Sequence, residues 1–288
     1  MRTPHIGHVK FLSLLFLATL QCSCAVIVHE SSLLLPSRVQ LFPDSTLATS
    51  RTKCKPIEVR VDTGVITRGW YFENPGSKRI LFYFYGRDGK LANFFHTFDS
   101  MALAYNADVF SMDYRGYGFS DGDAGLRTIT SDALIEYDSL QNQLNHDRKP
   151  VFVFGRSLGS GPAASIAAGR PVAGLILLSP PTTAAEVVPY GSKALPWYQR
   201  MFVHLIADDS LTQLKPQVID LIRQIKSPLL IIHGSADKII PPEFGRKLYN
   251  ECPSEKKRFV LIDGMNHVNI SIYTGTLRDS ILSFLNSY

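Results

Sequence analysis

The five residues 155–159 constrain the fold of this chain more than any other stretch. They read Gly-Arg-Ser-Leu-Gly and follow the apolar run Val151–Phe154. A short run of Val and Phe indicates a buried strand, and the small residues at 160–164 are expected to form a helix. Strand, Gly-x-Ser-x-Gly and helix in this order predict a nucleophile elbow, a sharp turn that exposes the Ser157 hydroxyl. The first N–H groups of the helix then point to the place where an oxyanion would form.

Strands and helices alternate along most of the chain. Repeated β-α units predict an α/β fold with a mostly parallel sheet and helices on both faces. Amphipathic spacing indicates helices at 91–106 and 128–145, and a helix closes the chain. Eight strands are expected, at residues 57–61, 66–72, 80–85, 107–112, 151–154, 172–178, 228–232 and 259–262. The short segment 182–226 lies between two of them and is expected to form a small cap over one end of the sheet.

The first 25 residues are typical of a secretory signal peptide. Arg2 and Lys10 precede an apolar run at 11–20, and small residues precede a cleavage site expected after Ala25. This pattern predicts export, to the outside of the cell or to the cell envelope. One alternative is an uncleaved membrane anchor, because residues 11–28 carry no charge, and another is acylation of Cys22 or Cys24. Residues 26–56 are then expected to form an arm or linker, and residues 57–288 the folded domain.

Composition excludes several other classes of protein. The formal net charge is +5 over 288 residues, and the basic residues are scattered apart from the run 256–258, so no nucleic-acid surface is expected. No Cys-x-x-Cys or His-x-x-x-His spacing suggests a metal, and no cofactor is expected. The sequence leaves open whether Cys54 and Cys252 form a disulfide or remain buried thiols.

A nucleophilic serine needs a base, and the base needs a carboxylate that orients it. Asp237 follows the strand expected at 228–232, and His267 follows the strand expected at 259–262. Because the carboxyl ends of parallel strands meet at one edge of a sheet, both side chains are expected near Ser157. These three residues are the predicted catalytic triad.

Other interpretations exist for two members of this triad. Asp237 also suits a loop or a helix cap, and His267 also suits a hydrogen-bonded loop histidine. His233 is the rival base, but it lies at the end of the strand that supplies the carboxylate loop, so we interpret it as structural. His96, on the helix after residue 85, is a more remote rival.

Five short motifs occur along the chain. They are Tyr-Gly-Arg-Asp-Gly at 85–89, Asp-Tyr-Arg-Gly-Tyr-Gly-Phe-Ser-Asp-Gly at 113–122, Gly-Arg-Ser-Leu-Gly at 155–159, His-Gly-Ser-Ala-Asp at 233–237 and Gly-Met-Asn-His at 264–267. In this order they resemble the motifs of serine hydrolases with the α/β-hydrolase fold. Within that superfamily the chain is most similar to the small, nearly lidless group that includes protein depalmitoylases and related lipid hydrolases. The resemblance covers about residues 57–288 and implies the α/β-hydrolase fold.

The resemblance also implies an oxyanion hole. Its donors would be the backbone N–H groups of Leu158, directly after the nucleophile, and of Arg87. The family has a His-Gly pair before the second donor, whereas this chain has Tyr85 in the place of the histidine. The segment 86–89 also has the composition of a simple turn.

The expected function is hydrolysis of a carboxylic ester or thioester through an acyl-enzyme. The partner is then a small or lipid-like acyl substrate, with membrane association through the N-terminal segment. Apolar residues in 182–226 suit either an acyl chain or packing against the sheet. A peptidase that acts on small peptides and a non-catalytic pseudo-hydrolase that binds a ligand are the alternatives.

Overall fold

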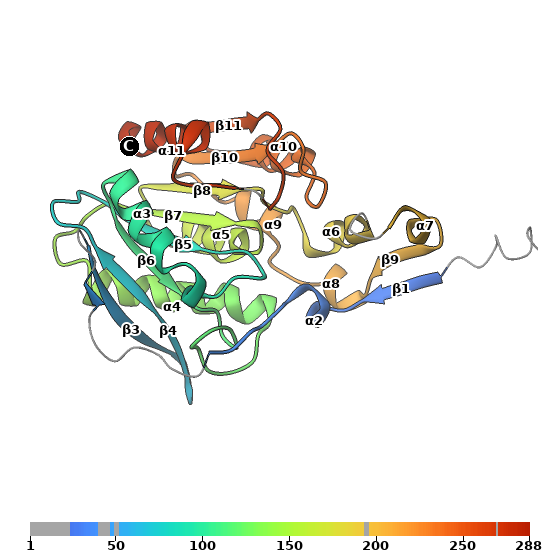
Figure 1. Ribbon diagram of the computed structural model, residues 1–288, viewed down its shortest axis with the longest axis horizontal. Helices are drawn as coiled ribbons and strands as arrows, with labels where there is room; N and C mark the ends of the chain where they lie inside the picture. Colours follow the sequence, from blue (N-terminus) through green and yellow to red (C-terminus); the bar gives the residue numbers. More distant parts are fainter. Residues whose placement is uncertain (1–23, 40–46, 49–51, 193–195, 269) are drawn as a thin grey trace, which may run out of the picture.

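A nine-stranded sheet forms the centre of the protein in this computed structural model, which describes residues 24–39, 47–48, 52–192, 196–268 and 270–288 (Figure 1). The strand order is β11-β10-β8-β7-β5-β6-β4-β3-β2, parallel from β11 to β6 and antiparallel from there on. The predicted α/β class is confirmed, and the ninth strand is the two-residue β2. The strands are β2 (Leu47–Ala48), β3 (Lys53–Asp62), β4 (Val65–Glu73), β5 (Ile80–Phe84), β6 (Asp108–Met112), β7 (Val151–Arg156), β8 (Gly174–Leu178), β10 (Leu229–Gly234) and β11 (Lys257–Ile262).

Helices cover both faces of this sheet, so its inner strands are apolar on both sides. Every residue of β5 is buried, as its continuous apolar sequence predicts. On one face lie α4 (Leu126–Gln143), α5 (Ser160–Gly169), α9 (Val218–Ile222) and α10 (Pro242–Glu251); on the other lie α3 (Phe95–Tyr105) and α11 (Gly275–Ser287).

The buried face of α4 contains two acidic residues that its apolar spacing does not predict. Asp132 receives two hydrogen bonds from the Arg115 guanidinium, at 2.9 and 2.8 Å. Glu136 is fully buried beside Thr67, and this burial raises its pKa to about 8. Burial without a cationic partner disfavours the charged form of a carboxyl group, which is the physical cause of the raised pKa of Glu136.

A small cap projects from the carboxyl end of the sheet (Figure 1). It consists of α6 (Ala184–Gly191), α7 (Trp197–Arg200), β9 (Val203–Ala207) and α8 (Asp209–Thr212). Strand β1 (Cys24–Val28), from the N-terminal arm, pairs in parallel with β9. The arm is therefore part of the cap, and β1 begins at the end of the cap farthest from the sheet.

Residues 1–23, which contain most of the predicted signal peptide, lie outside the described residues. The expected cleavage after Ala25 falls within β1. No helix among the described residues is long and apolar enough to cross a membrane. Cys54 and Cys252 are both buried free thiols, and burial raises the pKa of Cys54 to about 12.

Candidate active site

Ser157 lies at the turn from β7 into α5, in the backbone conformation of a nucleophile elbow. Its φ is +52°, a left-handed value that is strained for a residue with a side chain. The two flanking glycines allow this turn because nothing larger fits. A Cβ on Gly159 would lie 2.3 Å from the carbonyl oxygen of Phe84, and one on Gly155 would lie 2.4 Å from the carbonyl oxygen of Gly159.

The loops after β10 and β11 bring two further side chains to Ser157. His267 Nε2 lies 3.1 Å from Ser157 Oγ, and His267 Nδ1 lies 2.7 Å from Asp237 Oδ2. The Arg156 guanidinium donates a hydrogen bond of 3.1 Å to the His267 carbonyl oxygen, which links the elbow to the histidine loop. Hydroxyl, imidazole and carboxylate are thus connected in the order that base-assisted nucleophilic attack requires.

The Asp237 carboxylate is buried and held by several donors. Its Oδ1 accepts the N–H groups of Ile239 at 3.0 Å and Ile240 at 2.9 Å. Burial alone would raise its pKa, but the nearby His233 ring and the hydrogen bonds from His267 and the Ile240 N–H outweigh burial and hold the pKa below its ordinary value. The carboxylate is therefore charged at neutral pH and fixed beside the imidazole.

Neither rival histidine makes a described hydrogen bond to Ser157. His233 is fully buried, and its Nε2 lies 2.8 Å from the carbonyl oxygen of Ile240 and 3.6 Å from Asp237 Oδ2. The His233 ring packs beside the Asp237 carboxylate and makes no described hydrogen bond to Ser157, as a structural role predicts. His96 is exposed on α3.

The two donors expected for an oxyanion flank Ser157. Leu158 follows the nucleophile, and Arg87 lines the same cavity as Ser157. A Cβ on Gly86 would lie 3.7 Å from Ser157 Cβ, so the loop that contains Arg87 runs directly beside the nucleophile. The oxyanion role that the family resemblance implies for this loop stays a prediction.

Tyr85, in the place of the family histidine, is held by hydrogen bonds of its side chain and its backbone. Its hydroxyl donates a hydrogen bond of 2.8 Å to Asp113 Oδ1, and its carbonyl oxygen accepts the Tyr114 hydroxyl at 2.6 Å. Burial raises the pKa of Asp113, while the N–H groups of Leu91 and Phe119 and the Tyr85 hydroxyl oppose this effect. The loop 86–89, here named the oxyanion loop for the role that it is expected to have, thus follows a residue that is hydrogen-bonded to a buried carboxyl directly after β6.

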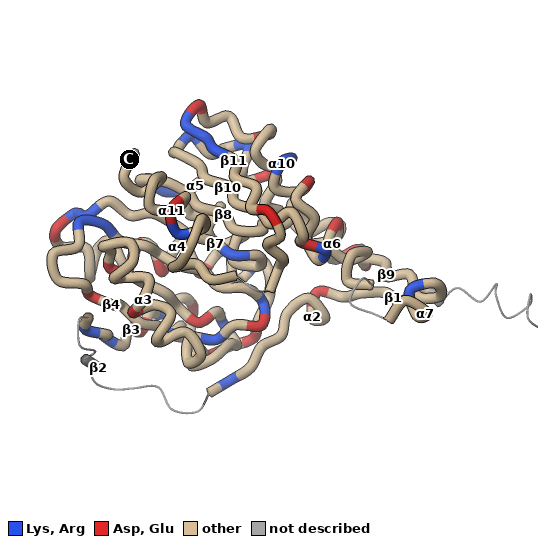
Figure 2. The backbone as a smooth tube through the Cα atoms, turned by 45° about the horizontal axis from the view of Figure 1, so that its top comes forward, with Lys and Arg blue, Asp and Glu red and all other residues tan. Residues whose placement is uncertain are grey.

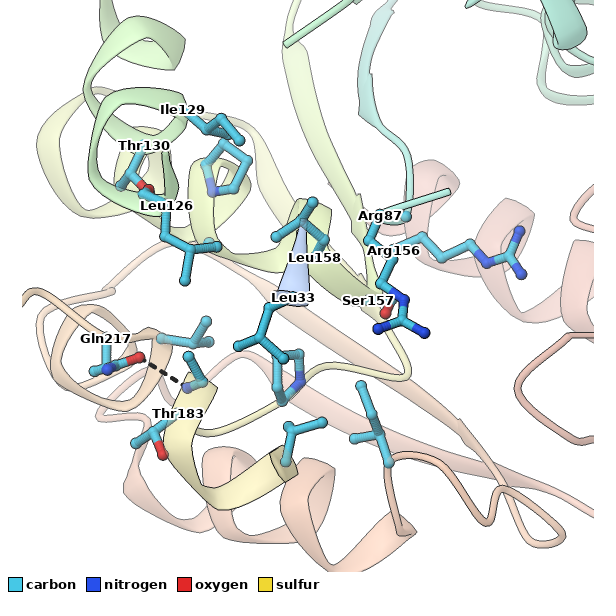
Figure 3. Close-up of a pocket in the computed structure, with 18 of the residues that line it drawn as sticks. Leu33, Arg87, Leu126, Ile129, Thr130, Arg156, Ser157, Leu158, Thr183 and Gln217 are labelled. Atoms are coloured by element: carbon cyan, nitrogen blue, oxygen red, sulfur yellow. Dashed lines mark hydrogen bonds between the residues drawn. The ribbon is translucent and has the colours of Figure 1, made fainter. Parts of the chain in front are cut away.

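A cavity of about 300 Å³ opens at Ser157 and is mainly apolar (Figure 3). The cap contributes Thr183, Ala184 and Val187, whereas Trp197 farther along the cap is 73% exposed. One part of the cap therefore serves the cavity and another faces solvent. The other apolar lining residues are Leu33, Leu126, Ile129, Leu158, Pro162, Pro181, Leu214, Pro216, Val218, Ile239, Ile240 and Val268.

Sequence reasoning missed the contribution of the N-terminal arm to this cavity. Leu33 belongs to α2 (Glu30–Leu33) and lines the cavity from outside the motifs. No spacing in the sequence connects it to the nucleophile. Across the part of the chain that the structure describes, no cluster of His, Cys, Asp or Glu is placed to hold a metal ion.

Comparison with known proteins identifies the family. The model of the serine aminopeptidase S33 family matches residues 76–216 and 209–270. The chain belongs to this family. The predicted resemblance to α/β-hydrolases and the predicted hydrolase class are thereby confirmed.

Relatives of this S33 family member span bacteria and animals. An uncharacterised protein of Mycobacterium tuberculosis is 29% identical over 86% of each chain. Human alpha/beta hydrolase domain-containing protein 17C is 25% identical over 69% of this chain and 56% of its own length. An esterase of Pyrococcus furiosus has the same fold, with a TM-score of 0.67, 19% identity and coverage of 82% of this chain and 93% of that one.

Proposed function

We propose that this protein is a serine hydrolase that cleaves carboxylic esters or thioesters of small or lipid-like acyl groups. The observation that carries this proposal is the hydrogen-bonded series from Ser157 Oγ through His267 to Asp237 at the mouth of an apolar cavity. The esterases among the proteins of the same fold support the choice of bond.

The reaction follows from this geometry. Ser157 Oγ attacks the substrate carbonyl carbon while His267 Nε2 takes the hydroxyl proton, and the N–H groups of Leu158 and Arg87 stabilise the oxyanion. Collapse breaks the bond to the leaving group, which receives the proton from His267, and leaves an acyl ester on Ser157. Water then attacks this ester and gives a proton to His267; collapse of this intermediate returns the proton to Ser157 Oγ and releases the acid. Asp237 holds the imidazole tautomer throughout.

The charge of the cavity favours an acyl chain over a peptide. An aminopeptidase must accommodate the ammonium group of its substrate, which acidic side chains attract. The described lining contains one carboxylate, Asp88, and two guanidinium groups, Arg87 and Arg156. This excess of positive charge disfavours binding of the ammonium group of a peptide substrate. Aminopeptidase activity, which the family description suggests, is therefore the second candidate.

Labelling with a fluorophosphonate probe tests the nucleophile. Ser157→Ala and His267→Ala should each abolish labelling and nearly all hydrolysis of p-nitrophenyl esters. Ser160→Ala is the matched control, because this buried hydroxyl three residues away has no hydrogen-bond partner among the described residues. Labelling that persists in Ser157→Ala would contradict the mechanism, and faster cleavage of aminoacyl anilides than of esters would favour the peptidase.

We also propose that the N-terminal segment directs export and brings the protein to a membrane. Strands β1 and β9 contain no charged residue (Figure 2). Exposed apolar side chains gather on this part of the cap, next to the point where the uncharged segment 11–23 enters β1. They are Val26, Ile27, Trp197, Tyr198, Met201 and Ile206. Mass spectrometry of the protein from its native host distinguishes a chain that starts at Val26 from one that keeps the segment as an anchor.

A further inference from the structure

Residues 29–39 of the N-terminal arm, here named the strap, are fixed to the cap at one end. The strap follows β1, which is paired with β9. The carbonyl oxygen of Val28 accepts the Asp208 N–H at 3.1 Å, and the His29 ring contacts the Asp208 carboxylate. The strap thus starts from a hydrogen-bonded position on the far side of the cavity from α4.

The middle of the strap is fixed to the first turn of α4. Glu30 Oε1 accepts the N–H of Leu126, the first residue of that helix. The N-cap residue of α4 is Gly125, which has no side chain to cap the helix. The Glu30 carboxylate supplies the missing acceptor and also suits the positive end of the helix dipole.

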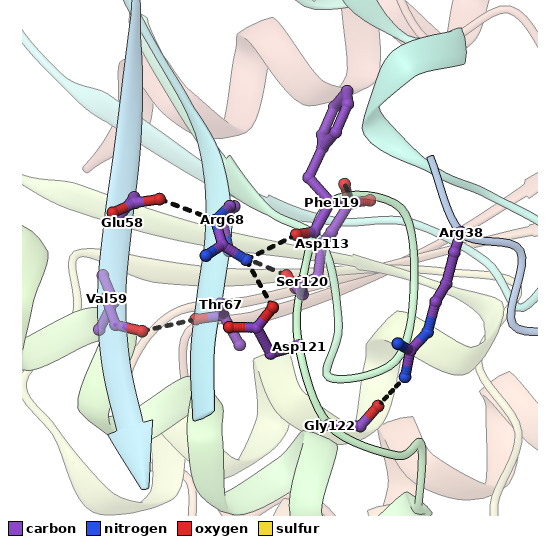
Figure 4. A network of polar contacts seen from close by, with 10 residues as sticks. All are labelled: Arg38, Glu58, Val59, Thr67, Arg68, Asp113, Phe119, Ser120, Asp121 and Gly122. Atoms are coloured by element: carbon purple, nitrogen blue, oxygen red, sulfur yellow. Dashed lines mark hydrogen bonds and ion pairs between the residues drawn. The ribbon is translucent and has the colours of Figure 1, made fainter. Parts of the chain in front are cut away.

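The far end of the strap joins the loop after β6. Gly118 exchanges two backbone hydrogen bonds with the strap, at 2.9 and 2.7 Å, and the Arg38 guanidinium donates to the Gly122 carbonyl oxygen (Figure 4). This loop is itself held by Arg68, which donates a hydrogen bond of 2.8 Å to Asp121 Oδ1. Hydrogen bonds therefore fix the strap on both sides of Leu33, its residue that lines the cavity.

Leu33 lies between these attachment points and reaches the cavity beside Leu126, Ile129 and Leu158 (Figure 3). Its neighbour Leu34 is only 3% exposed and packs into the core, so the backbone around Leu33 is held in position. We propose that the strap forms one wall of the acyl-binding site and that Leu33 limits the length of the acyl chain. This inference rests on the proposed acyl hydrolase function, but it assigns a specificity role to a segment outside the residues that the family model matches.

Substitutions of Leu33 test this role through the chain-length profile of p-nitrophenyl esters from acetate to laurate. Leu33→Trp should lower kcat/KM for octanoate and laurate about tenfold relative to acetate, since a mismatch in an apolar pocket has effects of this size. Leu33→Ala should shift the preferred ester to a longer chain. Leu35→Trp is the matched control, because Leu35 is exposed on the same strap and does not line the cavity.

Calorimetric titration with octanoate measures the affinity of the same cavity for an acyl chain without a catalytic step. We expect Leu33→Trp, and not Leu35→Trp, to weaken octanoate binding about tenfold. If the wild-type protein hydrolyses no ester but Leu33→Trp still binds octanoate more weakly than Leu35→Trp does, the proposed function is wrong and the proposed role of Leu33 in acyl-chain binding is supported. If the chain-length profile and the octanoate affinity of both Leu33 variants match those of Leu35→Trp, the inference is overturned. Leu33→Ala keeps the test valid if the larger side chain prevents folding.

Discussion

Replacement of Tyr85 by Phe removes one hydroxyl from beneath the oxyanion loop and leaves the ring in place. The ring packs 4.6 Å from Tyr114 and 5.7 Å from Phe94, measured between centroids, and neither contact depends on the hydroxyl. Asp113 loses one donor but keeps the N–H groups of Leu91 at 2.8 Å and Phe119 at 3.0 Å. Removal of one partner that leaves the other buried without it costs about 1–3 kcal/mol, so the free energy of unfolding should fall by about that amount.

The effect on catalysis should be separate from this loss of stability. Removal of a complete oxyanion donor lowers kcat about 100- to 1000-fold, and a loosened loop should have part of that effect, a decrease of about 10- to 100-fold with KM little changed. The control is Tyr71→Phe, because the Tyr71 hydroxyl also donates a buried hydrogen bond, of 2.6 Å, to Asp108, at the opposite end of β6 from Asp113. We expect both variants to lose similar stability in urea, and only Tyr85→Phe to hydrolyse p-nitrophenyl butyrate slowly. Equal kcat values for the two variants would refute the reasoning.

Three further changes test other parts of the structure. Asp237→Asn should lower kcat/KM for esters about 10⁴-fold, because an amide favours the wrong imidazole tautomer; activity near the wild-type value would contradict the triad. Gly159→Ala should destabilise the protein by about 1–3 kcal/mol in urea, because its Cβ would meet the Phe84 carbonyl oxygen, whereas Gly161→Ala has no neighbour closer than 3.7 Å and should not. Glu136 keeps a proton in the folded state that the unfolded chain loses, so wild-type stability should fall as the pH rises from about 4.5 to about 8, by at most about 5 kcal/mol. Glu136→Gln should remove this slope in urea titrations, and an unchanged slope would exclude Glu136 as its source.

The position of the candidate triad follows from local patterns and a general rule of topology. Ser157, Asp237 and His267 each follow an apolar run that the sequence identifies as a strand. Strands β7, β8, β10 and β11 are parallel neighbours, so the loops at their carboxyl ends must meet. Neither step depends on a contact between side chains, which is why sequence alone brings these three residues together. Their catalytic role remains a prediction for the labelling experiment.

The strap and the acids of α4 could not be predicted in this way. Cys24 in β1 pairs with Val203 in β9, 179 positions later, and nothing in either short apolar strand identifies its partner. Composition predicts an arm before the domain and says nothing of what the arm contacts. In the same way, Glu136 lies on the buried side of α4 because Thr67 and the packing around it accept a neutral carboxyl. Such positions depend on partners far away in the chain, which periodicity does not encode.

The attachment of β1 to β9 has a consequence for anyone who shortens this protein for expression. A boundary at residue 57, where alternation first indicates a regular strand, would remove every strap residue, including Glu30, the acceptor for the first amide of α4. The truncated enzyme would keep its three candidate catalytic residues and lose one side of its binding site. Kinetic constants measured on it would describe a more open and less selective hydrolase than the chain that keeps its N-terminal arm.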